Sequence, residues 1–169
     1  NIDNRGTFKM YGDYTIKGGD YLFTLQNIVN KKFTVQNGSK ITWTGDPTDA
    51  RLDLTAVYDL RASPIALTSS VGDTSDVYKD RTQVDVYLMM KGDLLEPSIS
   101  FDVDLPGFSE SDIVNQLLDP STTSEEVMNQ QVFSLLLTNN FFSQGSGVSA
   151  FSTTQVTTVE MLTNQFSNY

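Results

Sequence analysis

Two carboxylates separated by one residue, Asp102 and Asp104, are the side chains of this chain best placed to do acid–base chemistry. Side chains two positions apart on a strand share one face, and two close carboxylates perturb each other's pKa when they are buried. These aspartates alternate with Phe101, Val103 and Leu105, a pattern typical of a strand with one apolar and one solvent-facing side. The pattern favours a solvated polar face over a catalytic pair.

Other kinds of reactive site are scarce. The chain contains no histidine and no cysteine, which excludes Ser-His and Cys-His nucleophile pairs, and it has no G-x-S-x-G or P-loop motif. Asp73 and Asp76 are the residues that a calcium ion would use, but they lack EF-hand spacing, so an acidic loop is the better interpretation. Gly145-Ser146-Gly147 has the composition of a flexible linker. We expect no enzyme activity, no cofactor and no metal site.

The composition and net charge of the chain limit the kinds of partner that it can bind. The 169 residues include 11 basic and 21 acidic side chains, a net charge of −10. Such a surface repels phosphate backbones and anionic lipid headgroups, which argues against nucleic acid as a partner, but it does not affect the binding of acyl chains. The absence of cysteine suits a periplasmic protein, and no run approaches the ~20 apolar residues that span a bilayer. The chain begins almost directly before a predicted strand and ends within a predicted helix, which indicates a piece of a longer protein with targeting and anchoring segments elsewhere.

The elements that position these residues are mostly strands. Apolar residues recur with a period of two in four consecutive segments, separated by the turn signals Gly18-Gly19, Asn37-Gly38 and Gly45-Asp46-Pro47. The alternating sets are Tyr21, Phe23 and Leu25; Phe33 and Val35; Ile41 and Trp43; and Leu52, Leu54, Ala56 and Tyr58. We therefore predict an antiparallel meander with one apolar face.

Further strands flank this meander. Residues 6–16 predict a strand that bends at Gly12 and carries Phe8, Met10, Tyr14 and Ile16 on one side. Residues 68–81 are polar and lack periodicity, which predicts a long mobile loop. Two more strands are expected at 82–91, with Val84, Val86, Leu88 and Met90 on one face, and at 98–103, with Ile99, Phe101 and Val103.

At Leu105-Pro106-Gly107 the apolar period changes to that of a helix. Ser109 or Ser111 is expected to cap a short helix that ends at Asp119-Pro120, and Ser124 with Glu125 and Glu126 predicts the start of a longer one. The apolar stripes are Ile113, Val114, Leu117 and Leu118; Met128, Val132, Leu135 and Leu136; and, in a third helix, Val159, Leu162, Phe166 and Tyr169. The predicted organisation is a β domain at 1–104 and a helical segment at 105–169.

The predicted meander also contains a series of sequence motifs in a fixed order. A Gly-Gly turn leads into Y-x-F-x-L (Gly18 to Leu25), followed by Lys32-Phe33, by I-x-W-x-G-D-P (Ile41 to Pro47) and by A-x-L-D-L-x-A-x-Y (Ala50 to Tyr58). In this order the elements resemble the C-terminal domain of TamB, a periplasmic component of the translocation and assembly module in Gram-negative bacteria. FDVDLPGF (101–108), MNQQVFSLLLTN (128–139) and MLTNQFSN (161–168) are similar to downstream segments of that family.

This resemblance implies an open, curled antiparallel sheet, a β-taco with a hydrophobic interior, followed by C-terminal helices. It implies a non-enzymatic periplasmic module, part of an inner-membrane-anchored protein, that shields lipid acyl chains between the membranes and supports outer-membrane protein assembly. The implied partners are a TamA-like outer-membrane barrel and a phospholipid or an unfolded outer-membrane protein. The residues expected to line the groove are Phe8, Met10, Phe23, Ile41, Trp43, Leu52, Leu54, Val84, Val86, Leu88 and Phe101.

Periodicity alone leaves other interpretations open. An apolar sheet face must be covered, and an ordinary β-sandwich core would bury the same residues. A protein-interaction module would instead use an edge strand, whose unpaired backbone groups can accept a strand of a TamA-like barrel or of a client protein. The helical tail is also able to fold back over the groove. In the core and groove interpretations alike, Trp43 is expected to lie inside, against Leu52, Leu54 or Phe23.

Overall fold

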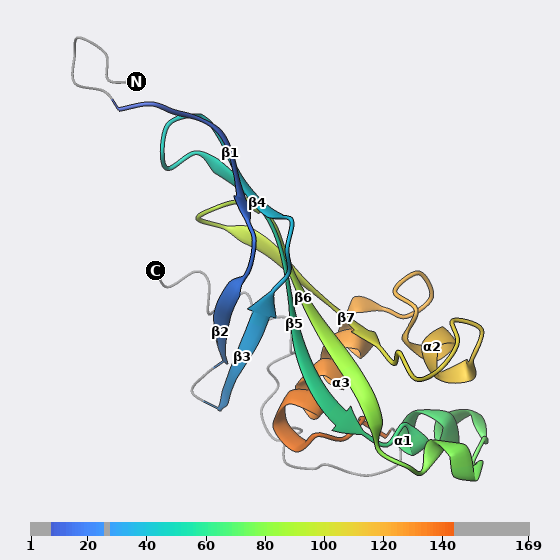
Figure 1. Ribbon diagram of the computed structural model, residues 1–169. Coiled ribbons are helices and arrows are strands. Elements are labelled where there is room, and N and C mark those ends of the chain that lie inside the picture. Colours follow the sequence, from blue (N-terminus) through green and yellow to red (C-terminus); the bar gives the residue numbers. More distant parts are fainter. Residues whose placement is uncertain (1–7, 26–27, 144–169) are drawn as a thin grey trace, which may run out of the picture.

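The computed structural model describes residues 8–25 and 28–143. The strands are β1 (Met10–Ile16), β2 (Gly19–Leu25), β3 (Val29–Val35), β4 (Ser39–Gly45), β5 (Ala50–Ala62), β6 (Thr82–Asp93) and β7 (Pro97–Asp104), and the helices are α1 (Ile65–Thr68), α2 (Ile113–Leu118) and α3 (Glu125–Thr138) (Figure 1). All seven strands belong to one antiparallel sheet that is not closed into a barrel. The predicted fold class, a mainly β structure followed by helices, is confirmed.

Strand β5 is the centre of the sheet. It pairs with β6 over its length, and β6 pairs with β7. On its other side β5 pairs first with β4 and then, through Thr34–Val57 and Val35–Ala56, with β3. Because β3 and β4 are both antiparallel to β5, the chain keeps its direction between them, and the same holds for β1 and β2, which pair with β4 and β3. The molecule is thus a meander of five long strands, two of which are kinked.

The kinks correct the prediction that Gly18-Gly19 and Asn37-Gly38 reverse the chain. Gly38 has φ 97°, a conformation that glycine adopts at little cost, and its N–H donates to the carbonyl of Ile16 at 3.1 Å. The N–H of Gln36 donates to the carbonyl of Thr55 at 2.8 Å, and the N–H of Thr55 donates to Ser39 Oγ at 3.1 Å. The buried Ser39 hydroxyl therefore replaces a sheet hydrogen bond that the kink interrupts.

The sheet curls until its two sides meet. Phe23 on β2 and Phe101 on β7 belong to strands at opposite sides of the sheet, yet their ring centroids lie 5.7 Å apart in an edge-to-face arrangement. The concave side carries the alternating apolar residues that the sequence predicts, whereas Tyr11 and Leu22 are exposed on the convex side. We call this concave apolar face the trough.

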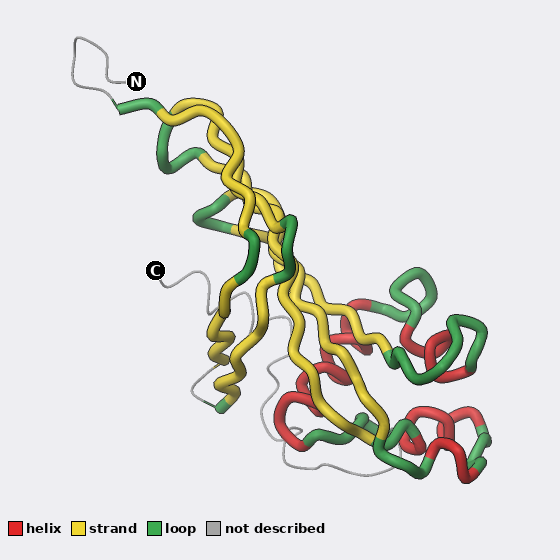
Figure 2. The backbone as a smooth tube through the Cα atoms, in the orientation of Figure 1, coloured by secondary structure: helices red, strands yellow, loops and turns green. Residues whose placement is uncertain are grey.

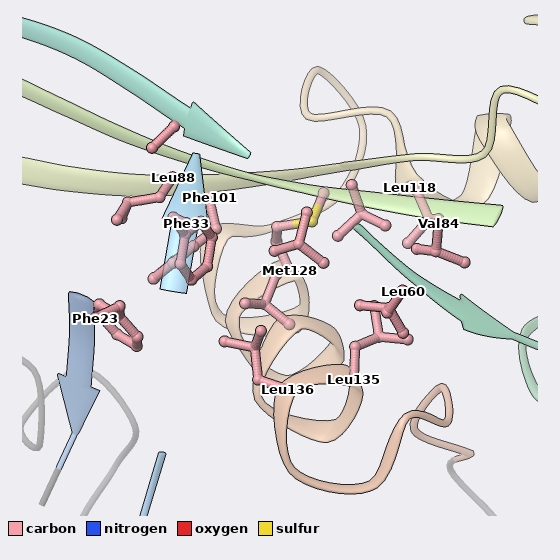
Figure 3. Packing of buried hydrophobic residues seen from close by; sticks show 14 of the residues in the cluster. Phe23, Phe33, Leu60, Val84, Leu88, Phe101, Leu118, Met128, Leu135 and Leu136 are labelled. Atoms are coloured by element: carbon pink, nitrogen blue, oxygen red, sulfur yellow. The ribbon is translucent and has the colours of Figure 1, made fainter. Parts of the chain in front are cut away.

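Helix α3 lies in the trough, where it contacts β7 and β3 (Figures 1 and 3). Its start is confirmed as predicted, because Ser124 Oγ accepts a hydrogen bond from the N–H of Val127 at 3.3 Å. The predicted stripe is confirmed as well: Met128, Val132, Leu135 and Leu136 are all buried in the core cluster.

The short helix α2 begins differently from the prediction. Its cap is Asp112, whose carboxylate accepts the N–H of Val114 at 3.1 Å, rather than Ser109 or Ser111. The two serine hydroxyls lie 3.1 Å from each other, outside the helix. Aspartate and serine cap equally well, so the sequence alone does not separate these positions.

The segment predicted as a long mobile loop, 68–81, is instead built from the end of α1 and two 3₁₀ turns, Ser69–Val71 and Asp76–Tyr78. Thr68 is fully buried. Tyr78 is buried against Phe108, at a centroid distance of 5.7 Å, and its hydroxyl donates to the Asp112 carboxylate at 3.2 Å. Isolated anchors such as Tyr78 carry no periodicity, which is why the sequence pattern missed them.

After α3 the chain folds back along the helix. The Gln131 amide makes two hydrogen bonds to the backbone of Phe142, at 3.1 and 2.9 Å, and Phe141 is buried in the core cluster. The predicted linker at 145–147 and the third helical stripe at 159–169 lie outside the described residues. Within the described ranges, no helix is long and apolar enough to cross a membrane.

Candidate functional site

The eleven residues expected to line the groove do not share one environment. Seven of them are buried in a single cluster: Phe23, Leu52, Leu54, Val84, Val86, Leu88 and Phe101. Ile41 is half-buried and packs against that cluster, and Met10 and Trp43 are half-buried. Phe8 is 51% exposed. Exposure therefore rises from the buried concave residues of β2, β5, β6 and β7 toward β4 and β1.

This gradient divides the trough into two halves. The covered half includes β3 and β7, which α3 contacts, and the buried concave residues of β2, β5 and β6. The open half consists of β1 and β4, whose concave apolar side chains are half-buried or exposed, whereas Ala50, Leu52 and Leu54 of the neighbouring β5 are buried. Figure 2 shows the helices gathered at one end of the molecule, while β1 and β4 project from the other end without a helix over them.

The prediction that Trp43 lies inside the core or groove is wrong in its contacts. It does not pack in the core cluster against Leu52, Leu54 or Phe23, and it is half-buried. Its indole N–H donates to the carbonyl of Pro47 at 3.1 Å, across the turn that follows β4. In the sheet it lies between Gly12 of β1 and Ala50 of β5, in the open half, where α3 does not reach.

The structure brings two aromatic residues to the site besides the eleven expected ones: Tyr14, which alternation had already placed on this side of its strand, and Phe133. Tyr14 lies on the concave side, opposite Ile41, and is 60% exposed. Phe133 comes from α3, and its ring centroid lies 6.1 Å from that of Phe101. Its position in the apolar run VFSLLL predicts a helix, but only the packing of that helix into the trough brings it to the sheet.

The convex side of the sheet is polar, and its most concentrated charge is a row of aspartates. Asp59, Asp85 and Asp104 are successive cross-strand partners on β5, β6 and β7. Desolvation and then the Asp85 carboxylate raise the pKa of Asp59. Desolvation also raises the pKa of Asp102, whose carboxylate accepts the N–H of Val103 at 2.8 Å. Like charges directly opposite each other destabilise a sheet.

We predict that Asp85→Asn raises the free energy of unfolding at pH 7, by less than about 1 kcal/mol, because it removes this repulsion. A carboxyl group with a raised folded pKa costs stability above that pKa, and the cost disappears as pH falls through it. The gain over the parent chain is therefore expected to shrink between pH 7 and about pH 3, as protonation of Asp59 removes one of the facing charges. Urea unfolding of the variant and the parent chain at pH 7 and at about pH 3 measures the free energy of unfolding. Asp53→Asn is the control, since Asp53 lies 3.9 Å from the Lys91 ammonium; an equal gain there would contradict the account.

The other acidic candidates have local roles. Asp73 accepts the backbone N–H of Ser75 at 3.0 Å and its hydroxyl at 2.5 Å, while Asp76 pairs with Lys79 at 2.5 Å. Among the described residues, no group of three acidic side chains is arranged to hold a metal ion. The convex face also has a depression of about 270 Å³, lined by Lys40, Thr42, Arg51, Leu52, Asp53, Lys91 and Gly92. Most of its lining residues are polar or charged, and it lies across the sheet from the trough.

Comparison with known proteins agrees with the fold. The family model described as the TamB C-terminal domain matches residues 1–169, the whole chain. A search of curated proteins and a search of solved structures found no match.

Proposed function

This chain belongs to the TamB C-terminal domain family, and from that premise we propose that its trough shields lipid acyl chains during their transfer between the inner and outer membranes. Proteins of this family are periplasmic bridge proteins of Gram-negative bacteria, associated with the TamA-type complex, and the domain is a non-enzymatic assembly and transport module. The proposal concerns what the trough carries, and through it the support of outer-membrane protein assembly.

The observation that supports the proposal is the gradient of exposure along the trough. A finished core would bury its apolar side chains equally, whereas Met10, Ile41 and Trp43 are half-buried and Phe8 and Tyr14 are exposed. Covering such surface stabilises a complex by about 25 cal/mol per Å². A shallow apolar face gains this free energy without specific polar contacts, which suits a ligand that slides along it.

The test is labelling with a phospholipid that carries a diazirine in its acyl chain. Vesicles that contain this lipid are mixed with the chain, irradiated, and the labelled peptides are identified by mass spectrometry. We expect label on the concave residues of β1 and β4, and competition by unlabelled phospholipid but not by glycerophosphocholine, which has no acyl chains. Absence of label above that of an unrelated acidic protein would refute the proposal.

The alternative, pairing of an edge strand with a TamA-like barrel or a client protein, is favoured by one observation. Within the described residues β7 pairs only with β6. The other edge of β7 therefore carries backbone groups that no described strand pairs, and such groups can accept an added strand. Capture of a barrel protein by a chain that takes up no lipid label would favour this alternative.

A further inference from the structure

We propose that Lys31 binds the anionic headgroup of an amphiphile whose acyl chain lies on the trough, so that the ligand is a lipid with a phosphate or a carboxylate. The inference rests on the proposed function and adds a headgroup site to it. It starts from the distribution of charge between the two sides of the sheet.

The register of the sheet puts Lys31 on the concave side. Lys31 lies directly opposite Phe23 in the pairing of β2 with β3, and directly opposed side chains of an antiparallel pair share one face. Phe23 is the residue whose ring contacts Phe101 inside the trough. The other charged residues of the seven described strands all fall on the alternate positions, which face the convex side. Among the described strands, Lys31 therefore carries the one charge on the concave side.

The Lys31 ammonium has no carboxylate partner. In the part of the chain that the structure describes, the ion pairs are made by Lys32, Lys40, Lys79 and Lys91. Lys31 is half-buried, and its Nζ lies over the ring of Tyr58, 5.3 Å from the centroid. An aromatic ring attracts a cation but does not neutralise it, and a charge that is taken out of water without a counter-ion is unfavourable. An anion on a bound ligand would supply the missing partner.

Two tyrosines near Lys31 are able to donate hydrogen bonds to the same anion. Tyr58 lies beneath the ammonium, and Tyr21 on β2 is the diagonal cross-strand neighbour of Lys31, a separation of about 7–8 Å that long side chains bridge. Both tyrosines are half-buried, and within the described ranges neither hydroxyl has a hydrogen-bond partner. Desolvation raises the pKa of Tyr21, so its hydroxyl stays protonated and able to donate.

Half-buried apolar side chains connect Lys31 with the open half. Strand β3 pairs with β5 at only two positions, and Figure 1 shows β2 and β3 diverging from β5 beyond them, where Lys31 and Tyr58 lie. Toward the open half, Tyr21 on β2, Ile16 on β1 and Ile41 on β4 pack against the core cluster and keep part of their surface accessible. An amphiphile with its headgroup at Lys31 can therefore lay its chain on apolar surface without displacing the core.

The test compares two amphiphiles with the same chain: dodecyl phosphate, whose head is anionic, and dodecyl maltoside, whose head is uncharged. Each is titrated below its critical micelle concentration into the full chain, and the heat of binding is measured. In the parent chain we expect tighter binding of dodecyl phosphate. Lys31→Met keeps most of the length of the side chain but removes its charge. We expect it to bind dodecyl phosphate about tenfold more weakly, the effect of losing one hydrogen bond to a charged group, and to bind dodecyl maltoside at least as tightly as the parent.

Lys32→Met is the matched control, because Lys32 is the next residue of β3, faces the convex side and pairs with Asp20 at 2.6 Å. We expect it to bind both amphiphiles with the parent affinity. Lys31→Arg keeps the charge and is expected to keep the preference for dodecyl phosphate. Inorganic phosphate, titrated alone, distinguishes a lipid headgroup from a free ion. We expect it to bind far more weakly than dodecyl phosphate, since it covers no apolar surface.

The outcomes separate this inference from the proposed function. If Lys31→Met binds dodecyl phosphate like the parent, or if Lys32→Met loses as much affinity, the headgroup site is wrong and the shielding of acyl chains stands. Inorganic phosphate that binds as tightly as dodecyl phosphate would also overturn the headgroup site. A parent chain that binds neither amphiphile would refute both proposals. Far-ultraviolet circular dichroism verifies each fold, and if Lys31→Met does not fold, Lys31→Gln removes the same charge.

Discussion

Replacing Phe33 with alanine is expected to lower the free energy of unfolding by about 3–5 kcal/mol, the cost of deleting a large buried aromatic ring. Phe33 is 0% exposed, and its ring lies 5.9 Å from that of Phe23 and 5.6 Å from that of Tyr58. It lies on β3, which pairs with β5 through only two residue pairs. The packing of Phe33 under α3 therefore carries much of the attachment of β2 and β3 to the rest of the sheet.

Urea unfolding followed by circular dichroism measures the loss. The matched control is Phe8→Ala, which deletes the same ring from an exposed position in the open half, and there we expect a change within about 0.5 kcal/mol. If the two variants lost the same stability, the division of the trough into a covered and an open half would be wrong. A loss of stability in Phe33→Ala but not in Phe8→Ala would show that the covered half is a folded core.

The sheet could be predicted from the alternation of apolar residues along its strands. Period two in Leu52, Leu54 and Ala56, and again in Val84, Val86 and Leu88, identified both the strands and their concave side, and the structure places these side chains in the core. A short-range pattern of this kind reports which way a side chain points from its own strand. It carries no information on which distant element will cover it.

Apart from the cap of α2, the differences between prediction and structure concern geometry between elements. Asn37-Gly38 has the composition of a reversing turn, and the structure uses its positive φ for a kink that keeps the chain direction, because Ser39 supplies the hydrogen bond that pairing with β5 then needs. Trp43 lies on the concave side of the sheet, as the alternation along its strand predicts. Helix α3 does not cover this part of the concave side. Burial at Trp43 depends on the length and path of a helix about 80 positions later in the sequence.

The same limit applies to the candidate groove. Sequence placed eleven residues on one apolar face, and nothing in their types separates Val86, which is 0% exposed, from Ile41, which is half-buried. The contact between Phe23 and Phe101 was equally hidden, since the two rings become neighbours only when the sheet curls. A chemical test of lipid binding therefore has to avoid the covered half, where a charge would unfold the protein and report nothing about a ligand.

Ile41→Asp is the substitution that meets this condition, and we expect it to reduce acyl-chain labelling at least about tenfold. Ile41 is half-buried on the concave side of β4, in register with Leu52 and Tyr14. An ionised carboxylate there has no partner once a hydrocarbon chain covers it, and a penalty of only about 1.4 kcal/mol is a factor of ten in affinity. In a complete, membrane-anchored protein, the same change is expected to impair outer-membrane assembly.

Thr44→Asp is the matched control, because Thr44 is exposed on the convex side of the same strand and receives the same charge. Its labelling is expected to equal that of the parent chain, as is that of Asp104→Asn on the convex side of β7. Circular dichroism of each variant verifies that the sheet has formed. Should Ile41→Asp fold like the parent and still take up label at the parent level, the concave side of β4 does not carry acyl chains. Pairing through the free edge of β7 then becomes the better account of this domain, because that edge offers backbone hydrogen bonds that a charge at Ile41 leaves untouched.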